Sequence, residues 1–138
     1  MLTGCFALTG GIIASAGGRL IKTLGAAGLA AFFASDADAG VRAMLDVQRA
    51  GDAWLVKQGF KSRALVKMDF GPVALGNVGA PGAEILDVYG KTVNTAAVLE
   101  SSGFAMTVAA FRALSAETRM LFKKHTPPIS YIAASARH

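Results

Sequence analysis

The sequence predicts a single α+β domain over residues 1–138, with a mainly antiparallel sheet and helices packed on one face. Short apolar runs with strand character alternate with longer stretches of helical periodicity. Turns rich in Gly and Pro separate these segments, without a linker, repeat or low-complexity tract. Because 53% of the 138 residues are hydrophobic and 17% are charged, the chain can bury one core and is not disordered.

The first third of the chain predicts a helix followed by a β-hairpin. Residues 5–16 favour a helix, although adjacent glycines at 10 and 11 lower its propensity. Residues 19–24 form a predicted strand, Gly25 and Ala26 a turn, and residues 28–33 the second arm of the hairpin.

A long amphipathic helix is predicted next, from a cap at Asp36 to about Gln58. Its apolar residues recur at helical spacing and predict a core stripe, with Trp54 at the edge. The residues at this helical spacing, both apolar and polar, are Val41, Met44, Leu45, Gln48, Gly51, Asp52 and Leu55.

The remainder predicts strands with two shorter helices between them. Gly103 follows the first of these helices in a position that suits a left-handed C-cap, and Pro81-Gly82 suits the corner of a β-turn. The predicted strands cover residues 62–70, 72–79, 84–89, 104–108 and 129–134, and the helices cover 91–102 and 109–114.

Charge and cysteine content narrow the function classes. The net charge of +5 favours anionic ligands such as nucleotides, but the basic residues are scattered without aromatic neighbours, which argues against nucleic-acid binding. A single cysteine, Cys5, excludes an intramolecular disulfide and predicts a reducing, cytoplasmic location. The apolar residues 2–16 are too short and glycine-rich to predict a membrane span.

Two charged residues lie in strands that are otherwise apolar, namely Lys22 and Asp87. They can form a structural salt bridge or point to solvent; alternatively, they can read a purine edge, because lysine donates to a ring nitrogen and a carboxylate accepts from an exocyclic amine. No Ser-His-Asp or Cys-His set can be assembled, since His125 and His138 both lie in the tail. No His/Cys cluster predicts a metal site.

Several motifs together resemble the class III nucleotidyl cyclases, that is, the adenylyl and guanylyl cyclases. The similarity covers about residues 5–135 and implies a ferredoxin-like cyclase homology domain that dimerises head to tail, with a nucleotide site at the interface. The motifs are Lys22–Gly25 (KTLG), Gly25–Phe32 (GAAGLAAF), Gly71–Val73 (GPV), Gly76–Gly79 (GNVG) and Asp87–Asn94 (DVYGKTVN).

The resemblance also implies roles for individual residues. Lys22 and Asp87 match the family's adenine readers, and Asn94 matches the residue that orients the ribose. Lys123 or Lys124 is a weaker match to the lysine that holds the triphosphate. ATP is therefore the expected ligand.

Three departures from the family predict that a homodimer is inactive. Ala26 stands where the second metal carboxylate is expected, and Val98 replaces the transition-state arginine four residues after Asn94. The family's first strand, of the form FxDIxGFT with the first metal carboxylate, is absent before Cys5. The family uses Mg²⁺ or Mn²⁺, but with no metal carboxylates we expect no metal cofactor and no catalytic residues here.

Three functions therefore remain open at the level of sequence. The leading hypothesis is a degenerate cyclase homology protein of cyclic-nucleotide signalling, inactive alone, that forms a homodimer or heterodimer and binds an adenine nucleotide. The second is the adenine-reading regulatory half of a heterodimeric adenylyl cyclase, against which Val98 argues. The third is a structural interaction module with no ligand site.

Overall fold

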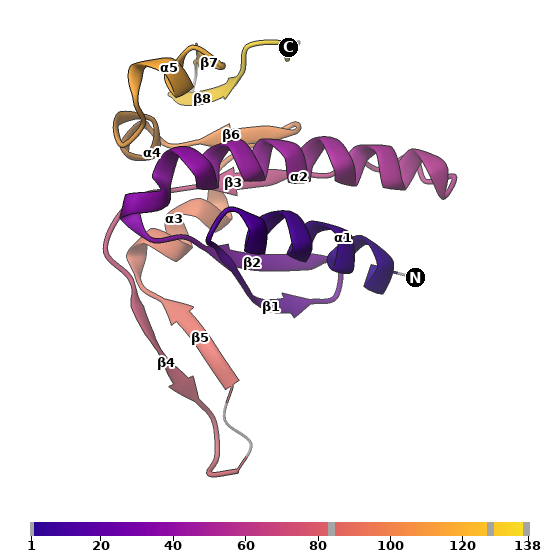
Figure 1. Cartoon of the computed structure of the whole chain (residues 1–138), viewed down its shortest axis with the longest axis vertical. Coiled ribbons are helices and arrows are strands. Elements are labelled where there is room, and N and C mark those ends of the chain that lie inside the picture. Colours follow the sequence, from indigo (N-terminus) through magenta and orange to yellow (C-terminus); the bar gives the residue numbers. More distant parts are fainter. Residues whose placement is uncertain (1, 83–84, 127–128, 137–138) are drawn as a thin grey trace.

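The computed structural model describes residues 2–82, 85–126 and 129–136 (Figure 1). Its first half holds two long helices, one hairpin and one short turn of 3₁₀ helix. In order, these are α1 (Leu2–Ser15), β1 (Arg19–Leu24), β2 (Ala27–Ala31), η1 (Ala34–Asp36) and α2 (Ala37–Lys57).

The second half holds six strands and three short helices. In order, these are β3 (Val66–Met68), β4 (Ala74–Val78), β5 (Ile85–Tyr89), α3 (Lys91–Val98), β6 (Phe104–Met106), α4 (Val108–Arg112), α5 (Ala116–Arg119), β7 (Phe122–His125) and β8 (Ser130–Ala133).

The strands form two antiparallel hairpins and one four-stranded sheet. β1 pairs with β2, and β4 pairs with β5. The larger sheet has the order β3-β6-β8-β7, and only its β3–β6 pair is parallel. Helices α1 and α2 pack against each other, α1 over β1 and α2 over β3 (Figure 1). The architecture confirms the α+β class and the mainly antiparallel pairing.

Each sheet has outer strands without a further partner strand in the described part of the chain. β2 pairs only with β1, and β3 pairs only with β6. The first described element is the helix α1, so no described strand precedes it. Within the described residues the strands therefore form three separate sheets and not one continuous sheet.

The core lies between α2 and the four-stranded sheet. Val41 and Leu45 on α2 are each 4% exposed and pack against Phe104 and Met106 of β6. Met44 packs at the side of this cluster. The predicted stripe of α2 is thus confirmed, and its burial stabilises the fold because it removes apolar surface from water. Trp54 is half-buried and stacks on Phe60.

The aromatic ring of Phe32 packs the end of the hairpin β1–β2 closely against α2. Phe32 follows β2, and its ring lies so close to both Gly18 and Gly40 that an added Cβ at either position would overlap with it. Only glycine allows such a close approach. The ring therefore sets the position of the hairpin against the long helix.

Some local predictions are wrong. Asp36 precedes α2 but makes no capping hydrogen bond, because the chain enters the helix through the 3₁₀ turn η1. Helix α3 ends at Val98, and the next residue, Leu99, is already extended. Gly103 is buried and does not have a positive φ. The backbone leaves the helix early because Gly103 must accept a hydrogen bond from the Val66 N–H where β6 meets β3.

A polar clamp that was not predicted joins α2 to the loop before β3. The Asp52 carboxylate accepts hydrogen bonds from Arg63 Nη2 at 2.9 Å, the Ala64 N–H at 2.7 Å and Gln48 Nε2 at 2.8 Å. Burial by itself would raise the pKa of Asp52, but these three donors outweigh it and lower the pKa. The contact between Gln48 and Asp52 could have been predicted, because the two residues are four positions apart on one helix. The contact with Arg63 could not, because it depends on the path of the chain after the helix.

Candidate functional site

The structure brings Lys22 and Asp87 together from two different hairpins. Lys22 Nζ on β1 donates to Asp87 Oδ2 on β5 at 2.9 Å, across a separation of 65 residues in the chain. The side chains are 29% and 19% exposed, so the pair is partly desolvated yet open to solvent on one side. The remaining carboxylate oxygen of Asp87, Oδ1, accepts from the Val88 N–H at 2.8 Å. An ammonium donor and a carboxylate acceptor thus lie next to each other at one accessible point.

Local backbone features place these two side chains. The register of β1 shifts between Leu20 and Lys22, which is a bulge in the ladder with β2. A bulge changes the direction in which the following side chains point. On the other hairpin, Gly76 is the residue paired with Asp87, and it has no side chain to cover the carboxylate. The geometry therefore leaves Asp87 open to an approach from β1.

The ion pair predicts a specific titration behaviour. The hydrogen bond from Lys22 holds the pKa of Asp87 below the ordinary aspartate range; burial opposes this, while the Val88 N–H and the charge of Lys22 add to it. Because the folded-state pKa is lowered, the contribution of Asp87 to stability is present above the ordinary aspartate pKa and is lost as the pH falls through the lowered value. We expect Lys22→Met to raise the pKa of Asp87 toward the ordinary range, as measured by NMR titration of the carboxyl carbon.

A second aspartate of the same chain provides the control for this titration. Asp38 also has a lowered pKa, but its main cause is the hydrogen bond from the Ser115 N–H, at the other end of the molecule. Its titration should not change in Lys22→Met. If the pKa of Asp87 is the same with and without Lys22, the ion pair is not formed in solution.

Asn94 lies on α3, which follows β5 directly. Gly90 has φ 139°, a value that side-chain-bearing residues rarely adopt, and this allows the chain to turn from strand into helix within one residue. The backbone N–H of Asn94 donates to Gly90 O at 3.3 Å. Its exposed side chain is free to contact a ligand. The three predicted site residues, Lys22, Asp87 and Asn94, thus lie on β1, β5 and α3. β5 contacts both β1 and α3.

The two lysines predicted for the triphosphate lie elsewhere. Both are exposed on β7, an edge strand of the four-stranded sheet, at the far end from the hairpins (Figure 1). Successive strand residues point to opposite faces of a sheet, so Lys123 and Lys124 cannot both face one phosphate group. Lys123 Nζ donates to Ala136 O at 2.5 Å. Lysines on an edge strand also prevent unwanted strand pairing, which is a sufficient structural role.

The two positions at which we expected departures from the cyclase motifs are exposed. Ala26 forms the turn between β1 and β2, and Val98, at the C-terminal end of α3, is 80% exposed. Within residues 2–82, 85–126 and 129–136 no group of three or more His, Cys, Asp or Glu side chains could hold a metal ion. His138, one of the two tail histidines, lies outside the described residues.

Comparison with known proteins shows similarity at the level of structure. No protein-family model and no curated protein sequence matches the chain. A bacterial light-regulated adenylyl cyclase is similar to it with a TM-score of 0.78 and 21% identity, over 99% of this chain and 45% of that one. The chain therefore spans less than half the length of that protein.

Two further structures extend the same similarity. The adenylyl cyclase CyaB from P. aeruginosa has a TM-score of 0.72 and 17% identity, over 99% of this chain and 81% of its own. The guanylate cyclase domain of RhGC from Catenaria anguillulae, in complex with GTP, has a TM-score of 0.71 and 17% identity, over 99% and 82%.

These neighbours define the class of protein by its fold. The chain has the fold of the catalytic domains of class III adenylyl and guanylyl cyclases. Particular features of this chain are an exposed alanine at 26, an exposed valine at 98 and the Lys22–Asp87 ion pair. None of the helices in the described ranges has the length and apolar character needed to cross a bilayer.

Proposed function

We propose that this chain is a catalytically inactive, cyclase-fold domain that dimerises and binds an adenine nucleotide without a metal ion, as a component of cyclic-nucleotide signalling. The purine would be read by Lys22 and Asp87, and the ribose would be oriented by Asn94. The observation that carries this proposal is the juxtaposition of the Lys22 ammonium and the Asp87 carboxylate from β1 and β5, at 2.9 Å and open to solvent.

The donor and acceptor of this pair fit the edge of adenine. Lysine offers three donors and Asp87 offers acceptor oxygens, so together they match a ring nitrogen acceptor beside an exocyclic amine donor. Binding must break or widen the present ion pair, because each group now satisfies the other. The loss is small, since water screens the two charges of a partly exposed ion pair.

Catalysis is not supported by the same site. Cyclisation needs metal ions to activate the 3′-hydroxyl and to neutralise the leaving pyrophosphate, and a cation to stabilise the transition state. Ala26 and Val98 cannot supply a carboxylate ligand or a positive charge. Removal of a single electrostatic element commonly lowers a rate by about 10²–10³. We therefore expect no turnover from a homodimer.

The second hairpin supports dimerisation. β4 and β5 extend away from the body of the molecule (Figure 1), and Leu75 and Tyr89 are 60% and 49% exposed. A two-stranded hairpin on its own is only marginally stable in water. Its exposed apolar side chains are the kind that a protein partner covers. A second copy of this chain or another cyclase-fold domain is the proposed partner.

Titration of adenosine and ATP tests the nucleotide site. We expect both ligands to bind in the absence of divalent metal, and we expect Lys22→Ala or Asp87→Ala to weaken binding by about tenfold or more, since each removes a charge-assisted hydrogen bond. Isothermal titration calorimetry measures the affinity, and sedimentation of the same samples measures the oligomeric state. Lys57→Ala, on the exposed end of α2, is the matched charge control and should bind as the wild type does.

The same experiment separates the alternatives. Binding that is unchanged in both variants, or absent from the wild type, would assign Lys22–Asp87 a structural role only. Cyclic nucleotide formed by the purified homodimer with Mn²⁺ would contradict the inactive assignment. Product formed only after addition of a cyclase-fold partner that supplies both metal carboxylates would favour the regulatory half of a heterodimer.

A further inference from the structure

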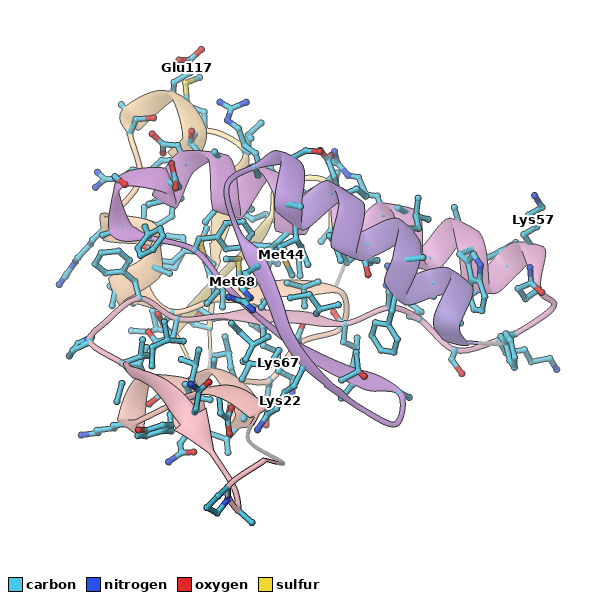
Figure 2. All side chains as sticks on the ribbon, turned by 60° about the horizontal axis from the view of Figure 1, so that its bottom comes forward. Lys22, Met44, Lys57, Lys67, Met68 and Glu117 are labelled. Carbon is cyan, nitrogen blue, oxygen red and sulfur yellow. The ribbon has the colours of Figure 1, made fainter. Side chains whose placement is uncertain are left out.

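A third lysine, which the sequence did not single out, lies on the side of the molecule that holds the Lys22–Asp87 pair. Lys67 is the middle residue of β3, and its Nζ donates to Ala97 O near the C-terminal end of α3 at 3.1 Å. β3 contacts α3, α3 contacts β5, and β5 contacts β1. Figure 2 labels Lys67 and Lys22 in the same central region of the molecule, apart from Lys57 at the end of α2.

The register of the sheet places Lys67 on the face away from α2. Lys67 pairs with Ala105, and Ala105 pairs with Ile132, so the three side chains project from one face. The neighbouring residues Val66 and Phe104 belong to the core cluster under α2 and therefore point to the opposite face. Ala105 and Ile132 are 0% and 5% exposed. The ammonium of Lys67 thus emerges beside a buried apolar strip.

Lys67 is positioned but not neutralised. The two ion pairs within the described ranges are Lys22–Asp87 and Arg63–Asp52, and neither includes Lys67. The acidic residue nearest in the strand, Asp69, accepts hydrogen bonds from the Thr107 hydroxyl and the Phe70 N–H. One of the three ammonium donors of Lys67 is used by the Ala97 carbonyl, which leaves the others available. A cation held in place with free donors is suited to bind an anion.

We propose that Lys67 is the phosphate-contacting residue of this site, and that its fixed positive charge takes the place of a bound metal ion in holding a polyphosphate. The inference rests on the proposed nucleotide function, because it assigns the phosphate end of the ligand whose purine end contacts Lys22 and Asp87. Lys123 and Lys124, on the edge strand β7, are not required.

Inorganic tripolyphosphate tests this assignment without a purine. We expect it to bind the wild-type protein in metal-free buffer, with an affinity that falls as the salt concentration rises. Lys67→Gln should weaken binding by about tenfold, the effect of one charge-assisted hydrogen bond, whereas Lys67→Arg should retain most of it. Lys57→Gln is the matched control and should bind as the wild type does.

A second measurement needs no variant. Tripolyphosphate should protect Lys67 of the wild-type protein from acetylation, as read by peptide mass spectrometry, while Lys57 stays reactive. If Lys67 only forms the hydrogen bond at the end of α3, Lys67→Gln will lower the melting temperature without changing the affinity for tripolyphosphate. Tripolyphosphate will then also fail to protect Lys67 of the wild-type protein from acetylation. Either result would overturn the proposal. Absence of tripolyphosphate binding to the wild type would overturn it as well.

Failure of the two proposals can be told apart. Loss of adenosine binding in Lys22→Ala reports on the purine site, because adenosine carries no phosphate. Tripolyphosphate binding reports on Lys67, because it carries no base. A protein that binds adenosine through Lys22 but shows no effect of Lys67→Gln on tripolyphosphate retains the proposed function and refutes the role of Lys67.

Discussion

Met106→Ala is expected to lower the free energy of unfolding by about 2–5 kcal/mol, the range for truncation of a large buried side chain. Met106 is 0% exposed and lies on β6, which has a strand partner on each side. Its side chain joins the cluster that includes Val41 and Leu45 of α2. Because packed strands surround β6, the structure cannot collapse around the cavity that the substitution leaves. Urea denaturation followed by circular dichroism measures the change.

A second methionine of the same chain provides the matched control. Met120 is 81% exposed, just after α5, so Met120→Ala should change the free energy of unfolding by no more than about 0.5 kcal/mol. The urea dependence of the unfolding free energy should be the same in both variants, since neither changes the area that unfolding exposes by much. Similar losses for Met106→Ala and Met120→Ala would mean that β6 is not the centre of the core.

Gly40→Ala is the second substitution with a large expected effect. We expect it to destabilise the protein, whereas replacement of glycine by alanine within a helix usually stabilises it. In an exposed helix interior, alanine is favoured over glycine by about 0.5–1 kcal/mol. At Gly40, however, the new methyl group would lie 2.8–3.1 Å from three atoms of the Phe32 ring. The same ring also lies close to Gly18, which limits the room into which Phe32 can move. We expect a net destabilisation of about 1–3 kcal/mol from overpacking.

Gly11→Ala tests the same substitution without the aromatic ring. Gly11 is within helix α1, and an added Cβ there would have no neighbouring atom within 4 Å. Thermal unfolding should therefore show opposite signs, a higher melting temperature for Gly11→Ala and a lower one for Gly40→Ala. Replacement of Phe32 by leucine in the Gly40→Ala background should recover part of the loss. Stabilisation by Gly40→Ala would show that Phe32 is not wedged against α2.

The packing of the Phe32 ring against Gly40 also affects the candidate site. Phe32 follows β2, and β2 pairs with β1, which carries Lys22. A displacement of the hairpin from α2 would therefore move the Lys22 ammonium relative to Asp87. Gly40→Ala should accordingly raise the pKa of Asp87 toward the ordinary range, in the same direction as Lys22→Met but by a smaller amount. The stability of the fold and the geometry of the site thus depend on the same contact.

Patterns that depend on neighbouring residues in the chain could be predicted from the sequence. β1 has the predicted bounds, Arg19–Leu24, and α2 ends within one residue of the predicted Gln58. Both follow from local chemistry, namely an apolar run closed by a glycine turn and a long amphipathic repeat. The glycine and asparagine motifs of residues 71–94 likewise led to the correct fold class, which the cyclase-fold neighbours confirm.

Elements with weak local signals could not be predicted. β7 contains two lysines and a histidine in four residues, and it becomes a strand only because β8 supplies the hydrogen-bonding partner. Helix α5 has four residues and depends on the Ser115 cap. Helix α3 ends early because the chain must reach the side of β3. In each case a contact from elsewhere in the chain outweighs the local preference.

The sequence by itself determined that Lys22 and Asp87 are exceptional, because a charged residue in an apolar strand requires a partner or a use. Through the resemblance, it also predicted that residues needed for catalysis are missing. Only the tertiary structure decided that the two charges form one ion pair, and that Lys67 donates to the end of α3 while Lys123 and Lys124 lie on the edge strand β7. The physical reason is that strand pairing brings together residues separated by tens of positions, and register determines which face each side chain occupies.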